Sequence, residues 1–148
     1  MIEIKIGKQG AGMSRNYFSG IEAQLADCAV CILHTYIAHK DFQNDFLRHP
    51  NEQNELLEPY VKAYLDGQDH EQRNIGNNIP DYNKLLVSFS RLILMMYVNE
   101  PDFKSEMDNI SKYSGKFEKS FPDVQQARLI FAQYAKLFWK ARKHKSHG

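Results

Sequence analysis

Two cysteines and two histidines lie close together in the chain, and residues of these types can bind metal or carry out redox chemistry. They are Cys28, Cys31, His34 and His39. A Cys-x-x-Cys pair indicates a zinc site when a second such pair follows, and a redox site when it stands at the start of a helix. Here no second pair follows, and both cysteines fall in the middle of a predicted helix. We therefore expect no metal and no cofactor, and keep a metal- or redox-dependent function of Cys28 and Cys31 as an alternative.

The N-terminal segment combines a strand-like pattern with a glycine-rich loop. In Ile2–Ile6 every second residue is isoleucine, which is typical of a half-buried β-strand. A phosphate-binding loop needs its lysine directly before a Ser or Thr at the start of a helix, and here Lys8 comes well before Ser14. We therefore predict an extended arm and Gly-rich loop over residues 1–20. Its strand could pair with a partner or with a second copy, as a homodimer.

The charge of the chain is distributed unevenly, although the formal net charge is only +1. None of the 18 Asp and Glu residues follows Asp123, whereas six of the 19 Lys and Arg residues do. Such an asymmetry is typical of a polar surface that meets a partner. Basic residues near the C-terminus of a helix also complement the helix dipole, so a solvated basic end without a partner is the alternative interpretation.

A helical wheel of the last predicted helix separates an apolar face from a basic face that includes the single tryptophan. The apolar face holds Ala127, Ile130, Phe131, Tyr134, Leu137, Phe138 and Ala141. The basic face, which is our candidate partner-binding site, holds Arg128, Lys136, Trp139, Lys140 and Lys143. Cations around an aromatic ring suit nucleic acid, because they neutralise phosphates while the ring stacks on a base. They also suit a protein partner, because Trp and Arg are frequent anchors at interfaces.

Among these classes of function, the sequence favours a non-catalytic protein that binds another protein. The chain contains no HExxH, no GxSxG, no complete phosphate-binding loop and no repeated His and Glu motif of di-iron bundles, so we expect no catalytic residues. Dedicated nucleic-acid domains are usually basic throughout, and this chain is not. We therefore predict a protein partner, as for an inhibitor, immunity or adaptor protein. A nucleic-acid-binding helical subunit that uses the same basic face is the alternative.

Hydrophobic periodicity predicts an all-α fold. The predicted helices cover about residues 19–36 with a continuation or short second helix at 42–47, then 51–67, 81–98, 102–113 and 120–144. We expect a single-domain bundle of five or six helices over residues 21–148, after the short extended N-terminal segment. The helix at 81–98 is apolar almost all the way round, so we predict that it is the central one. With two cysteines, no signal sequence and no apolar run of membrane length, we expect a cytoplasmic protein that does not bind membranes.

Overall fold

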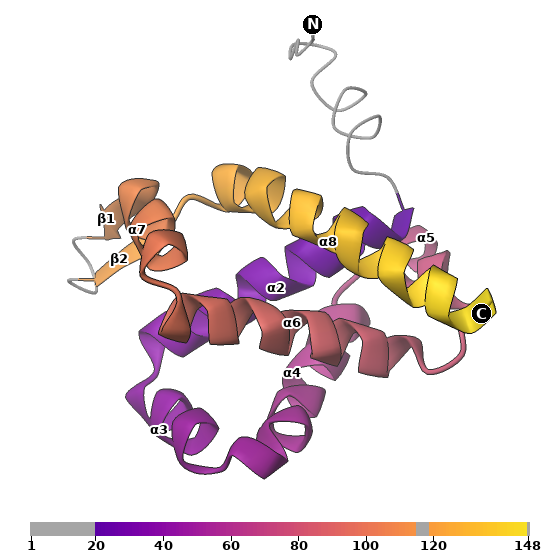
Figure 1. The fold of residues 1–148 in the computed structure, drawn as a ribbon, viewed down its shortest axis with the longest axis horizontal. Helices are drawn as coiled ribbons and strands as arrows, with labels where there is room; N and C mark the ends of the chain where they lie inside the picture. Colours follow the sequence, from indigo (N-terminus) through magenta and orange to yellow (C-terminus); the bar gives the residue numbers. More distant parts are fainter. Residues whose placement is uncertain (1–19, 115–118, 148) are drawn as a thin grey trace, which may run out of the picture.

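The computed structural model describes residues 20–114 and 119–147, with the backbone alone for residues 113, 114, 119 and 143–147. It confirms the predicted all-α bundle, because helices make up most of the described chain and pack around one core (Figure 1). The predicted N-terminal arm, including Ile2–Ile6, lies outside the described residues. Pairing with a second copy through that arm therefore stays a prediction.

The described residues form seven α-helices, two short 3-10 helices and one β-hairpin, instead of five or six helices. In chain order these are α2 (Gly20–Ala38), α3 (Lys40–Arg48), η1 (Pro50–Glu52), α4 (Gln53–Asp66), α5 (His70–Arg73), η2 (Asn74–Gly76), α6 (Tyr82–Asn99), α7 (Pro101–Asn109), β1 (Ser111–Ser114), β2 (Lys119–Pro122) and α8 (Val124–His147). The extra helix is the single turn α5, which lies between the helices predicted at 51–67 and 81–98. Asp69 caps this turn, since its side chain accepts a hydrogen bond from the backbone N–H of Gln72 at 2.8 Å.

The central helix is α2, and the prediction that the helix at 81–98 is central was wrong. α2 packs against α8, α6 and α4, whereas α6 leaves Arg91, Leu92 and Val98 exposed. Small buried residues such as Ala26 and Ala29 let the neighbouring helices approach α2 closely, and the prediction had weighed large side chains instead. Among the described helices, α2 is long and apolar enough to cross a membrane by length and composition alone, but half of that stretch is buried inside the bundle.

Two buried glutamines connect neighbouring helices through side-chain hydrogen bonds. The Gln24 side chain donates to the carbonyl oxygen of Gln72 at 2.8 Å and accepts from the Tyr82 hydroxyl at 2.5 Å, which ties α2 to α5 and α6. The Gln53 side chain donates to the carbonyl oxygen of Phe46 at 2.9 Å and accepts from Arg91 Nε at 2.7 Å, which ties α4 to α3 and α6. Both amides are therefore hydrogen-bonded through both of their polar atoms, as burial requires.

A β-hairpin stands where the ends of two helices were predicted. β1 pairs with β2 antiparallel, with Lys112 opposite Phe121, so the predicted helix at 102–113 ends early and the last helix starts late. The last helix begins after Pro122, and Asp123 caps it by accepting from the backbone N–H of Gln126 at 3.1 Å. Nε2 of His34, on α2, donates to the carbonyl oxygen of Pro122 at 2.9 Å, which anchors the hairpin to the bundle.

Candidate functional site

The side of α8 that points away from the bundle combines exposed leucines with exposed lysines. α8 packs mainly on α2 and buries Ala127, Phe131 and Ala135. The opposite side, which we call the α8 outer face, consists of Leu129, Gln133, Lys136, Leu137 and Lys140, all of them exposed. Leu137 has the largest exposed fraction of the big apolar residues in the described chain, 66%, and Leu129 is 48% exposed. A helix face of this kind can bind a surface that is itself part apolar and part acidic.

Lys136 and Lys140 have no ion-pair partner among the residues that the structure describes. α8 contains no Asp or Glu, so these ammonium groups have no carboxylate neighbour along their own helix. The Arg142 guanidinium differs, because it lies 4.8 Å from the centre of the Phe138 ring. The two lysines of the outer face are therefore available to a negatively charged partner.

The structure does not bring the five predicted partner-binding residues together on one exposed face. Lys136 and Lys140 are exposed as predicted, and the side chain of Lys143 lies outside the part of the chain that is described. Arg128 is half-buried, with Nε 3.5 Å from Oδ1 of Asp27 on α2. Trp139 is also half-buried and packs against the core, so the prediction that it projects among the cations was wrong.

The error on Trp139 has a physical cause. Ala132 lies on the same flank of α8 as Arg128 and Trp139, and it is buried, so the buried side of the helix extends to that flank. A wheel of one helix shows the order of side chains around the axis but not how much of that circle the neighbouring helices cover. The same limit explains Leu137, which was assigned to the apolar core face and is exposed. Leu129 was not singled out, although its place on the side of the helix opposite the buried stripe was a signal.

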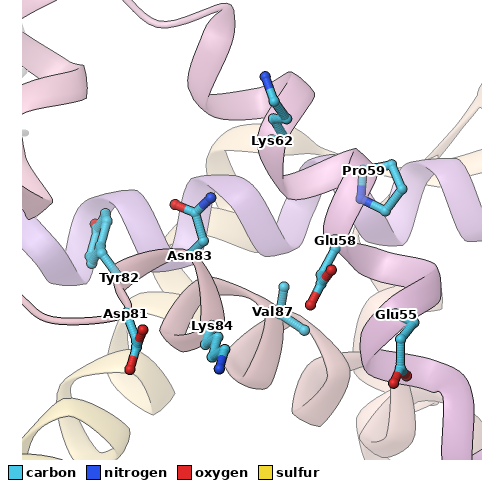
Figure 2. Close-up of a pocket in the computed structure, with 9 residues that line it drawn as sticks. All are labelled: Glu55, Glu58, Pro59, Lys62, Asp81, Tyr82, Asn83, Lys84 and Val87. Carbon is cyan, nitrogen blue, oxygen red and sulfur yellow. The ribbon is translucent and has the colours of Figure 1, made fainter.

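A second surface feature is a groove between α4 and the start of α6 (Figure 2), which the sequence did not suggest. Its volume is about 690 Å³, and it is lined by Glu55, Glu58, Pro59, Lys62, Asp81, Tyr82, Asn83, Lys84 and Val87. Figure 2 shows Glu58 pointing from α4 toward Val87 of α6, with Asp81 and Lys84 at the other end of the groove. We call this hollow the α4–α6 groove.

Carboxylates outnumber lysines along the α4–α6 groove. Glu55, Glu58 and Asp81 have no ion-pair partner among the described residues, whereas the charge of Lys62 is offset by Asp66 at 2.9 Å. Asp81 stands at the N-cap position of α6, but its side chain makes no capping hydrogen bond and its backbone adopts the left-handed conformation, with φ of 55°. Its carboxylate is thus left free beside the groove.

The Cys28 and Cys31 pair is split between the inside and the outside of the bundle. Cys28 is buried, and burial raises the pKa of its thiol to about 12, although Ser90 donates a hydrogen bond to its sulfur at 3.8 Å. Cys31 is exposed as a residue, but loss of water around its sulfur and the nearby Asp27 carboxylate raise its pKa as well. Both thiols therefore stay protonated at neutral pH, which makes them weak nucleophiles and weak metal ligands. No three His, Cys, Asp or Glu side chains of the described residues are grouped so that they could hold a metal ion.

Comparison with known proteins gives no relative from which a function could be transferred. The sequence matches no protein-family model, and neither the curated proteins nor the solved structures yield a match. Any functional argument therefore depends on the surfaces described above.

Proposed function

We propose that this protein is a non-catalytic interaction protein, of the inhibitor, immunity or adaptor type, that binds another protein through the α8 outer face. One observation carries the proposal, namely the exposed Leu137 with Lys136 and Lys140 beside it on a helix that has no carboxylate. Apolar surface left in water is unfavourable by about 25 cal/mol per Å², so covering this leucine stabilises a complex. The lysines add attraction for an acidic partner and select against a basic one.

The same surface favours a protein partner over a nucleic acid. Contact with a charged phosphate backbone does not bury the apolar surface of the leucines, so it does not stabilise them. A half-buried Trp139 is also poorly placed to stack on a base. The absence of carboxylates from α8 keeps nucleic acid as the second candidate, since lysines bind phosphate as readily as carboxylate. The partner that fits best is a protein surface with carboxylates around an apolar hollow.

The test compares proteins captured by three forms of the full chain. In the first variant, Leu137→Ser and Lys140→Ser remove one leucine and one lysine from the α8 outer face. In the control, Leu47→Ser and Lys40→Ser remove the same two residue types from exposed positions on α3. Interface anchors contribute more than about 1 kcal/mol each, so we expect the first variant to lose about tenfold or more of a specific partner. The control is expected to retain it.

Quantitative capture from cells of the natural source, followed by mass spectrometry, measures this difference. If the α8 variant and the wild type capture the same proteins in the same amounts, the proposal is wrong. Nucleic acid is tested by titrating a single-stranded oligonucleotide while recording the fluorescence of Trp139, which is next to Lys140. A saturable change that disappears as salt rises would replace the protein partner with nucleic acid.

A further inference from the structure

We infer that the α8 outer face binds the α4–α6 groove of a second copy of this chain, so that copies associate head to tail. This inference rests on the proposed function, because it uses the same α8 surface and names a protein that fits it. It depends on two described surfaces of the same molecule that complement each other in shape and in charge.

The first complementarity is one of shape. Leu137 stands out from α8 with two thirds of its surface exposed, and it lies on a single, regular helix. The α4–α6 groove is a hollow of about 690 Å³ whose lining includes the exposed ring of Pro59 and the almost fully buried Val87. A hollow of this size accepts several side chains, so Leu137 can enter it together with parts of its neighbours on α8. When the two surfaces meet, Leu137 and the exposed apolar part of the groove, chiefly Pro59, lose unfavourable contact with water.

The second complementarity is one of charge. Lys136 and Lys140 lie on either side of Leu137 along the helix, and neither has an ion-pair partner in the described part of the chain. Around the groove, Glu55, Glu58 and Asp81 equally lack such a partner, and these three carboxylates outnumber Lys84, which is unpaired as well. Bringing the two surfaces together therefore places unpaired ammonium groups beside unpaired carboxylates. Opposite charges of this kind set the orientation of a contact and speed its formation.

The contact has to form between copies and not within one. Figure 1 shows α8 on one side of α6 and α4 on the other, and α4 packs mainly against α6 and α2. The α8 outer face thus cannot reach the groove of its own chain. Because two different surfaces meet, each bound pair leaves one free α8 outer face and one free groove. Such a heterologous contact extends into longer assemblies unless its rotation closes a ring.

Sedimentation velocity of the full-length protein tests the inference. We expect the average mass of the wild type to rise from micromolar toward millimolar concentration at low salt and to fall back at high salt, because the charged groups are exposed. A knob variant carries Leu137→Ser with Lys140→Ser, and a groove variant carries Glu55→Gln with Glu58→Gln. Each of the two is expected to stay monomeric alone, while the Leu47→Ser and Lys40→Ser control associates like the wild type.

Mixing the two variants gives the decisive result. The knob variant keeps an intact groove and the groove variant keeps an intact knob, so the mixture should form a one-to-one dimer and nothing larger. A wild type that remains monomeric throughout, or a mixture without dimer, overturns the inference. A dimer that persists in both variants overturns it too, because the predicted Ile2–Ile6 strand or another surface would then hold the copies together. Circular dichroism melts confirm that the variants are folded.

The outcome also separates this inference from the proposed function. If the wild type is monomeric but the knob variant still loses a captured partner, the α8 outer face binds a different protein and only the head-to-tail contact is wrong. If the wild type is monomeric and the knob variant loses nothing, both are wrong.

Discussion

Because Gly76 has no Cβ atom, η2 can pack closely against the start of α6. Gly76 is buried, and a Cβ atom at this position would overlap the Tyr82 ring. The Tyr82 hydroxyl in turn donates to Gln24 at the centre of the bundle. The ring therefore cannot move without giving up a buried hydrogen bond, which makes Gly76 necessary for packing.

We expect Gly76→Ala to destabilise the protein by about 1–3 kcal/mol, the usual effect of forcing extra atoms into a packed core. Gly67→Ala is the matched control, because a Cβ there meets only ordinary contacts, 3.5 Å from the Ala63 carbonyl oxygen. That control should be neutral or stabilising by up to about 1 kcal/mol, since alanine restricts the unfolded chain. Urea denaturation of both variants measures the difference, and equal midpoints would contradict the packing argument.

At the residue level, the sequence predicted some of the candidate site and missed the rest. The exposure of Lys136 and Lys140 follows from their place opposite Phe131 on a helical wheel, and the structure shows it. The burial of Trp139 does not follow, because it depends on how α2 crosses α8. The α4–α6 groove likewise depends on two helices that lie apart in the sequence, so no local pattern could reveal it.

Among the elements, the hairpin of β1 and β2 is joined to the bundle by the side chain of His34 on α2. The ring of His34 lies 5.3 Å from the ring of Phe121, and its Nε2 donates to the carbonyl oxygen of Pro122. Burial lowers the pKa of His34 below its ordinary value of 6.5, although the hydrogen bond to Pro122 works in the other direction. The folded state thus prefers the neutral ring.

This preference makes stability depend on pH. Well above pH 6.5 the ring is neutral in both the folded and the unfolded state, so its contribution is fully present. As pH falls below 6.5, the unfolded chain takes up the proton first, and stability decreases until the folded ring is protonated too. We expect His34→Gln, which can still donate to Pro122, to flatten this part of the profile of melting temperature against pH. His39→Gln controls for the loss of an exposed histidine nearby, and identical profiles for wild type and His34→Gln would refute the assignment.

The hairpin also shows why element boundaries were harder to predict than the fold class. Helical periodicity in 102–113 continues up to Ile110, and nothing in Ser111 or Lys112 forbids another helical turn. Tertiary contacts decide instead, since β2 packs on α7 and α2. A local hydrogen bond from the Ser111 hydroxyl to the carbonyl oxygen of Met107, at 2.7 Å, adds to the end of α7. The long helices α2, α4, α6 and α8 were predictable because each carries several turns of apolar periodicity.

On the scale of the whole molecule, charge is polarised between the two ends of the described bundle. α8 has no carboxylate, whereas α3, η1 and α4 together carry six carboxylates and three Lys or Arg residues. The sequence alone predicted this asymmetry along the chain, and the structure turns it into a separation in space (Figure 1). A particle with one basic and one acidic side has an electric dipole that can align neighbouring copies before they touch.

The packing of α2 on α8 has a consequence for the order of folding. The two helices that bury each other lie at opposite ends of the described chain, so α2 leaves the ribosome long before the surface that covers it exists. During that interval a nascent chain presents a helix that could cross a lipid bilayer by length and composition alone. A chain that stops before Val124 should therefore float with lipid vesicles in a density gradient or aggregate, whereas the full chain should stay in the aqueous fraction. Completion of α8 would then be the step that withdraws α2 from membranes and chaperones.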